Sequence, residues 1–249
     1  MSPAAGADPE LIGGPRHALP GVAQVHVGAA PHAANVQAEV VHGWGILSYH
    51  RRVIPAVVLA AGRSARMGRP KALLAAGPSD TFLTRILRTF RDAGAEDIVV
   101  VVGANADGIV ESVARQGLTP RFVLNPNFES GQLSSLLAGI GAIDRPGVSA
   151  MLLTLVDVPL VSASTVRAVL ERYRHTRAPI VRPVHGSRHG HPVLVDRRLF
   201  EAVRRADPSE GVKPVVRAHV SAEGDVEVDD EGAFVDIDTP DDYARFFPG

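Results

Sequence analysis

Short apolar runs rich in β-branched residues alternate with segments of helical periodicity from Val53 onward, and this alternation constrains the fold most. The runs cover residues 53–59, 97–102, 121–124 and 151–156. Runs of this length that are apolar at nearly every position are typical of strands buried on both faces. The alternation predicts right-handed strand–helix–strand units, and hence an α/β fold: a single Rossmann-like, three-layer domain with a mainly parallel sheet.

Apolar stripes predict the helices between these runs. The first stripe spans residues 82–90 and predicts a helix with arginines on its opposite face. This helix is expected to be capped at residues 79–81 and to end at Gly94. The second repeats leucine and isoleucine at helical spacing over residues 133–140. After Asp157 the pattern is mixed. There it predicts helices at 163–175, 199–205 and 212–219, and strands near 180–184, 192–195, 226 and 234, which would add antiparallel strands and a wall facing the substrate.

Residues 1–52 differ from the rest of the chain. They are rich in Ala, Gly, Pro and His, and five prolines interrupt them before position 32. Their apolar residues follow neither the period of a helix nor that of a strand. Residues 1–52 are therefore expected to form a flexible, disordered extension to a domain at 53–249. Within the extension, only residues 40–49 have enough apolar bulk to dock on the domain.

The composition excludes several classes of protein. The chain of 249 residues has 26 Lys and Arg against 27 Asp and Glu, and no cysteine. A balance so close to neutral argues against a general nucleic-acid binder, and the absence of cysteine excludes disulfides and thiolate metal sites. There is no apolar run of membrane-spanning length and no secretory signal pattern. A cytoplasmic protein without membrane or nucleic-acid partners is therefore expected.

A loop of small and cationic residues follows the first apolar run. Residues 60–62 let a ligand approach the backbone closely, and the next nine positions hold four cations: Arg63, Arg66, Arg69 and Lys71. In an open parallel sheet, ligands bind at the carboxyl ends of the strands, where this loop must lie. A polyphosphate would suit the loop; the alternative is a solvated basic loop. The loop matches neither a Walker A motif nor a dinucleotide-binding fingerprint.

Carboxylates occur at two later points. Asp157 follows the run 151–156 and is expected at the carboxyl end of a central strand, where Mg²⁺ could link it to a triphosphate. A helix cap is the alternative for Asp157. Asp236 and Asp238 flank Ile237 and are expected on the same side of a strand, with an exposed strand end as the alternative for Asp236. Residues 51–91 are basic and residues 223–242 are acidic, so a phosphate clamp and a metal clamp could meet across one crevice.

Two further segments could contact a ligand. Residues 131–135 begin a helix whose amides, with the hydroxyls of Ser134 and Ser135, could bind a base or phosphate, or could serve only as a cap. Three histidines, His185, His189 and His191, could hold zinc, although no fourth ligand is evident.

Together these motifs resemble the MobA-like nucleotidyltransferases, particularly the branch of the molybdenum cofactor cytidylyltransferases. The similarity spans residues 53 to about 243. It rests on the loop 59–71, Asn125-Pro126, Gly131 to Leu136, Asp157-Val158-Pro159, Gly190-His191-Pro192 and Asp236 to Pro240. Val158 stands where this branch often has Gln or Met.

The resemblance implies a role for each matching residue. Nucleotide binding falls to Leu59, Ala60, Ala61, Gly62, Ser64, Arg66, Lys71, Asn125, Ser134 and Ser135. It also implies that Lys71, Arg66 and Asp157 are catalytic, that Asp157 and Asp238 bind Mg²⁺, and that His191 contacts the acceptor.

The resemblance further implies Mg²⁺-dependent transfer of a nucleoside monophosphate from an NTP to a phosphate-bearing acceptor, with release of pyrophosphate. CTP is the leading nucleotide and molybdopterin the leading acceptor, and transient contact with a cofactor-receiving enzyme is possible. A sugar phosphate or another small phosphate is the alternative acceptor. The alternative to an enzyme is a nucleotide-binding module that has no catalytic activity.

Overall fold

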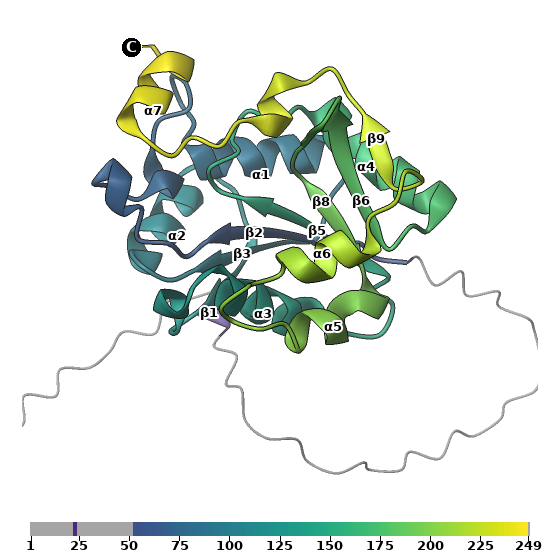
Figure 1. Ribbon diagram of the computed structural model, residues 1–249. Coiled ribbons are helices and arrows are strands. Elements are labelled where there is room, and N and C mark those ends of the chain that lie inside the picture. The colour runs from purple at the N-terminus through teal and green to yellow at the C-terminus, as the bar shows by residue number, and fades with distance from the viewer. Residues whose placement is uncertain (1–21, 24–51, 249) are drawn as a thin grey trace, which may run out of the picture.

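The computed structural model describes residues 22–23 and 52–248, which form one mainly parallel sheet covered by helices (Figure 1). The strands are β1 (Val22–Ala23), β2 (Ala56–Ala60), β3 (Ile98–Val102), β4 (Arg121–Leu124), β5 (Ala150–Leu155), β6 (Ile180–His185), β7 (Arg188–His189), β8 (Val193–Asp196) and β9 (Asp225–Glu227). The helices are α1 (Phe82–Asp92), α2 (Ala106–Arg115), α3 (Gln132–Ile143), α4 (Ala163–Thr176), α5 (Phe200–Arg204), α6 (Lys213–His219) and α7 (Pro240–Phe246).

The strand order is β1-β4-β3-β2-β5-β8-β6-β7, with β9 beside β6. The chain moves outward from β2 through β3 to β4, then returns to the other side of β2 as β5. Strands β1 to β5 are parallel, and β8 enters antiparallel to β5. The order therefore reverses between β2 and β5, which is where open α/β sheets bind ligands. Both the predicted α/β class and the mainly parallel sheet are confirmed.

Helices cover both faces of the sheet. In β2, Val58 faces the core formed with α1, α2 and α4, whereas Val57 and Leu59 face the core formed with α3 and α5. Figure 1 shows α1 and α4 on one side of the sheet and α3 and α5 on the other. Burial on both faces explains why β2 and β3 are apolar at every position. The expected three layers are present.

Several elements differ from the sequence-based expectation. Helix α2 was not predicted, because Asp107, Gly108 and Glu111 interrupt its short apolar pattern. The strand expected near Phe234 is wrong: this residue ends a 3₁₀ turn, and the chain to Asp238 has no regular structure.

The segment before Arg52 contributes one described element. Strand β1 extends the sheet at its edge, with Val22 opposite Phe122 and Ala23 opposite Val123 on β4. Residues 40–49, where docking was considered, lie outside the described residues. Within the described ranges, no helix is long and apolar enough to cross a membrane.

Candidate active site

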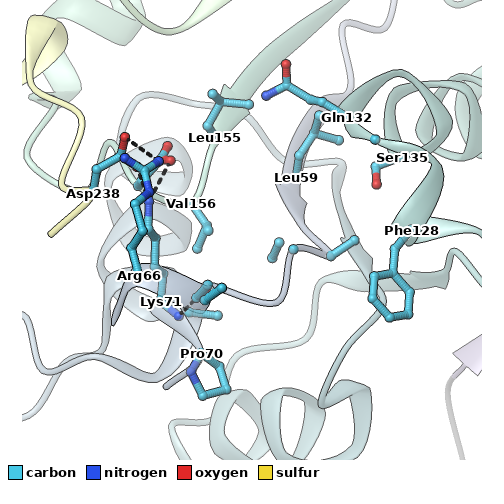
Figure 2. A pocket seen from close by; sticks show the side chains of 18 residues that line it. Leu59, Arg66, Pro70, Lys71, Phe128, Gln132, Ser135, Leu155, Val156 and Asp238 are labelled. Carbon is cyan, nitrogen blue, oxygen red and sulfur yellow. Dashed lines mark hydrogen bonds and ion pairs between the residues drawn. The ribbon is translucent and has the colours of Figure 1, made fainter. Parts of the chain in front are cut away.

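A cavity of about 400 Å³ opens at the carboxyl ends of β2 and β5. Its lining consists of Leu59, Ala60, Ala61, Gly62, Ser64, Ala65, Arg66, Pro70, Lys71, Ala72, Phe128, Gly131, Gln132, Ser135, Leu155, Val156, Asp157 and Asp238. Figure 2 shows Arg66, Lys71 and Asp238 gathered on one side, with Gln132 and Ser135 across from them. The cavity therefore has a charged wall and a polar wall. We call it the nucleotide cavity, because eight of the ten residues that the resemblance assigns to the nucleotide line it.

The loop after β2 is held closed by Ser64. This residue adopts a left-handed backbone with φ of 53°, and its Oγ accepts a hydrogen bond from the Lys71 backbone N–H at 3.0 Å. Gly68, with φ of 66°, makes a second left-handed turn in the loop. A short polar side chain and glycine are the residues that adopt this conformation most readily. These two turns return the chain to the cavity, so that Lys71 lies in its lining.

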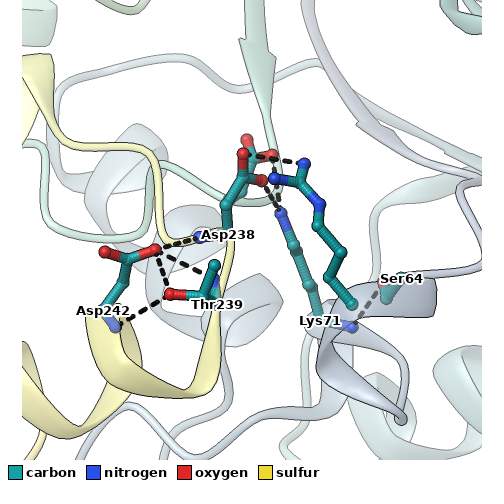
Figure 3. Close-up of polar contacts among 7 residues, drawn as sticks. Ser64, Lys71, Asp238, Thr239 and Asp242 are labelled. Atoms are coloured by element: carbon teal, nitrogen blue, oxygen red, sulfur yellow. Dashed lines mark hydrogen bonds and ion pairs between the residues drawn. The ribbon is translucent and has the colours of Figure 1, made fainter.

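Two cations of this loop meet two carboxylates from distant parts of the chain. Lys71 Nζ lies 2.5 Å from Asp238 Oδ1 (Figure 3) and 3.0 Å from Asp157 Oδ2. Arg66 Nη2 lies 2.9 Å from the other oxygen of Asp238, Oδ2 (Figure 2). The Lys71 side chain is only 10% exposed, whereas that of Arg66 is 69% exposed. The hydrogen bond from Lys71 holds the pKa of Asp238 below its usual value, despite partial burial. The predicted meeting of the basic loop with the acidic C-terminal segment is present in the structure.

The backbone around each carboxylate is fixed. Asp157 does not cap a helix, so that alternative is wrong: Ser162 caps α4 instead. The Asp157 carbonyl accepts a hydrogen bond from Ile237 N–H at 2.8 Å, which joins the C-terminal segment to the end of β5. Asp242, in the capping box of α7, accepts a hydrogen bond from Asp238 N–H at 3.2 Å (Figure 3). Asp238 is thus anchored on both sides.

The wall opposite these charges depends on Asn125. Its buried side chain donates from Nδ2 to Ser134 Oγ at 2.9 Å and to Ser135 Oγ at 3.0 Å, while its Oδ1 accepts a bond from Asn127 N–H. Ser135 lines the nucleotide cavity, but Asn125 and Ser134 do not. Asn125 and Ser134 instead stabilise the turn that leads into α3 through hydrogen bonds within the protein.

Sequence reasoning missed Phe128, an aromatic residue that lines the nucleotide cavity. The Phe128 ring packs close to Gly103, where an added Cβ would lie 2.7 Å from the ring and 2.7 Å from the Ala61 carbonyl oxygen. A glycine directly after a strand of five apolar residues was the signal that something approaches closely there. Arg63 pairs with Glu129 and lies over the Phe128 ring, so it joins this wall and not the carboxylates.

A second cavity, of about 960 Å³, adjoins the first along Leu59, Gln132 and Leu155. We call it the acceptor cavity, because it is lined by His191, the residue that the resemblance assigns to the acceptor. Its floor is apolar and comes from β5, β8 and α3, and its rim includes Lys213 and Arg217 on α6. His191 and Asp236 also line it. Thus Asp236 and Asp238, which were expected on the same side of a strand, line different cavities because the segment between them is irregular.

Burial shifts the pKa of two residues that line the second cavity, His191 and Asp236. Burial lowers the pKa of His191, against the opposing effect of Asp236, and the buried Nδ1 has no hydrogen-bond partner. The partial burial of the Asp236 carboxyl and the charge of Asp157 raise the pKa of Asp236. His191 therefore presents a neutral ring to the acceptor cavity at neutral pH. Val158, at the position that differs from the resembled branch, is fully buried and lines neither cavity.

The carboxylates suit a hard divalent cation. Asp157 Oδ1 is buried without a hydrogen-bond partner, as a ligand oxygen would be. In the part of the chain that the structure describes, no three His, Asp or Glu side chains come together as a metal site, and this holds for the three histidines considered for zinc. Mg²⁺ commonly binds through one or two carboxylates together with substrate phosphates, so two carboxylates are sufficient.

Comparison with known proteins identifies relatives over most of the chain. The MobA-like NTP transferase domain matches residues 56–223. A nicotine blue oxidoreductase from Paenarthrobacter nicotinovorans is 33% identical over 77% of this chain and 95% of its own length. The molybdenum cofactor cytidylyltransferase of Escherichia coli K12 is 28% identical over 76% of this chain and 93% of its own.

A solved structure, Rv0371c from Mycobacterium tuberculosis H37Rv, superimposes with a TM-score of 0.63 at 30% identity, covering 79% of this chain and 99% of that one. The same protein has also been solved as a complex with manganese, with a TM-score of 0.60 at 28% identity over 78% of this chain and 97% of that one. The chain belongs to the MobA-like NTP transferase family and is a nucleotidyltransferase.

Proposed function

We propose that the protein transfers a nucleoside monophosphate from an NTP to a phosphate-bearing small molecule and releases pyrophosphate, with Mg²⁺ as cofactor. CTP and molybdopterin are the leading substrates. One observation carries the proposal: two cations and two carboxylates converge on one wall of the nucleotide cavity, and this cavity adjoins a second, larger one. The similarity to a molybdenum cofactor cytidylyltransferase supports the choice of substrates.

In the nucleotide cavity, the NTP would lie along the backbone of residues 59–62. Its base would face the wall that carries Gln132 and Ser135, and its triphosphate would turn toward Lys71 and Arg66. The two cations would neutralise the negative charge that develops on the departing pyrophosphate. Asp157 and Asp238 would hold Mg²⁺, which supplies Lewis-acid stabilisation of charge at the α-phosphate.

The acceptor would occupy the acceptor cavity. Its phosphate would cross the shared boundary toward the carboxylates of the nucleotide cavity, while its apolar body would rest on the floor formed by β5 and β8. An ionised phosphate oxygen needs no protein base to attack the α-phosphorus, so the protein has to position it and neutralise charge. Neutral His191 would contact the acceptor through its ring without adding charge. Lys213 and Arg217 would bind further anionic groups at the rim.

Pyrophosphate release tests the proposal. The full chain is incubated with Mg²⁺, each of the four common NTPs, and a panel comprising molybdopterin, sugar 1-phosphates and sugar-alcohol phosphates. We expect release only with one NTP and one class of acceptor together. No release with any pair, combined with tight NTP binding, would favour the non-catalytic alternative.

The oxidoreductase relative provides a second candidate, because the large apolar floor of the acceptor cavity could hold a redox ligand as well as an acceptor. Oxidation of reduced nicotinamide and flavin nucleotides in the presence of quinoid dyes tests it. In that reaction Asp157 and Asp238 would have no metal to bind, so their asparagine variants should keep redox activity. If the reaction is nucleotidyl transfer, both variants should lose the release of pyrophosphate.

A further inference from the structure

The carboxylates assigned to the metal are already neutralised by the protein itself. Lys71 Nζ lies between Asp157 and Asp238, at 3.0 Å and 2.5 Å from their oxygens. Arg66 takes the remaining oxygen of Asp238 at 2.9 Å. Both oxygens of Asp238 are therefore engaged, and Asp157 Oδ1 alone has no partner. A divalent cation bound by both carboxylates has to replace at least one of these protein cations.

The charges of the cluster decide when this replacement is favourable. Two positive side chains face two negative ones, so the cluster is close to neutral without any ligand. Adding a divalent cation alone would leave Lys71, with its largely buried side chain, among like charges at short range. A triphosphate changes the balance, because it gives Lys71 and Arg66 new anionic partners and contributes oxygen ligands of its own.

The surrounding contacts keep the carboxylates in place while the cations are free to turn. Asp238 is fixed by Asp242 and by the bond from Ile237 to Asp157, as described above. The backbone of Lys71 is fixed by Ser64, but its ammonium group stands at the end of four rotatable carbons. Exchange therefore needs a side-chain rotation and no movement of the fold.

We infer that Lys71, with Arg66, acts as a built-in counter-ion that occupies the cation position until an NTP draws it away. Divalent cations then bind weakly to the free protein and more tightly once nucleotide is present. Because coupling between two ligands is reciprocal, the cation raises nucleotide affinity by the same factor. This inference rests on the proposed function for the identity of the two ligands, but the exchange itself is a property of the four side chains.

The test uses Mn²⁺ as the probe, measured by the loss of its free electron-paramagnetic-resonance signal on titration with the nucleotide-free full chain. Lys71→Met removes the ammonium and keeps the length of the side chain, and Lys71→Gln keeps polarity as a second variant. Arg69→Met is the matched control, because Arg69 lies on the same loop with its guanidinium over the Tyr243 ring. Circular dichroism establishes that each variant is folded.

We expect both Lys71 variants to bind Mn²⁺ at least tenfold more tightly than the wild type, and Arg69→Met to match the wild type. Adding Asp157→Asn to Lys71→Met should abolish the gain. Wild-type-like or weaker Mn²⁺ binding by folded Lys71 variants would overturn the inference, and so would a gain that survives Asp157→Asn.

Failure of the inference and failure of the proposed function can be told apart. Pyrophosphate release by the wild type, without a gain of Mn²⁺ affinity in the Lys71 variants, rejects the counter-ion exchange and leaves nucleotidyl transfer standing. A gain of affinity that disappears with Asp157→Asn, in a protein with no pyrophosphate release for any substrate pair, supports the exchange and rejects the reaction.

Discussion

Lys71 Nζ lies 2.5 Å from Asp238 Oδ1, although 167 positions separate the two residues in the sequence. The contact joins the cationic loop after β2 to the acidic segment before α7. A side chain 10% exposed between two carboxylates is held by charge on both sides. All four members of this cluster line the nucleotide cavity, so changing any of them should affect activity.

Asp157→Asn should reduce turnover by at least about 100-fold, on the scale of other lost electrostatic contacts in active sites. Asparagine has nearly the same shape but lacks the charge that holds Mg²⁺, so the melting temperature should stay within a few degrees of the wild type. Pyrophosphate release and thermal unfolding measure the two effects. Activity within a few-fold of the wild type at ordinary Mg²⁺ would exclude the metal role.

Lys71→Ala should also lower kcat by about 100-fold or more, because it removes the ammonium group that would neutralise the leaving pyrophosphate. A smaller loss of NTP affinity is expected, since Arg66 remains. Steady-state kinetics separate these effects. If KM changes alone, Lys71 contributes to binding and not to the transition state.

Two glycines of α3 should respond in opposite ways to alanine. An added Cβ at Gly139 would lie 2.7 Å from Val57 Cγ1 on β2, so Gly139→Ala should destabilise the fold by about 1–3 kcal/mol through overpacking. At Gly141 the space is open, so Gly141→Ala should stabilise the fold by about 0.5–1 kcal/mol through helix propensity. Denaturant unfolding measures both. Equal effects would contradict the described packing of α3 on β2.

His191 should make stability depend on pH. Burial lowers its pKa below the value of about 6.5 that applies in the unfolded chain, so near pH 6 the unfolded state binds more protons than the folded one. Stability should consequently fall as the pH drops below about 6.5, until the folded-state pKa is passed. His191→Gln removes this contribution, so its unfolding free energy should decline less between pH 7.5 and 5. Parallel curves for the two proteins would show that His191 is not buried as a neutral ring.

Residues 1–52 should be dispensable for catalysis. A chain beginning at Val53 keeps both cavities and all four charged residues of the cluster. It loses the short strand β1, so a drop of a few degrees in melting temperature is expected from the exposed edge of β4. Activity and thermal unfolding of the shortened chain check this. Loss of turnover would show that the segment belongs to the working enzyme.

Much of the fold could be predicted because a strand that is buried on both faces has a short, almost entirely apolar sequence. The run at residues 121–124 coincides with β4, and the capping box of Thr81 begins α1 where the sequence placed a cap. Helix α2 left no such mark, because its buried residues Ile109 and Val113 make a stripe of only two.

The site could be predicted in part for a related reason. Charged residues that directly follow a buried strand are expected at the edge of the sheet where ligands bind. This expectation identified Asp157 and the loop that ends at Lys71. The roles of Asn125 and Ser134 in holding a turn, and the approach of Phe128 to Gly103, depend on contacts between segments that no local pattern records. The separation of Asp236 from Asp238 was missed because alternation was assumed where the backbone is irregular.

The bond from Ile237 to the Asp157 carbonyl has a consequence for the order in which the molecule is completed. During synthesis the chain emerges from its N-terminus, and the strands that flank the cavity are available long before residue 237. A nascent chain that stops short of Asp238 can form the parallel sheet and the cationic loop, yet it leaves Lys71 with Asp157 alone. The cluster therefore depends on nearly the whole length of the chain, and a nascent chain of 230 residues still lacks one of its two carboxylates.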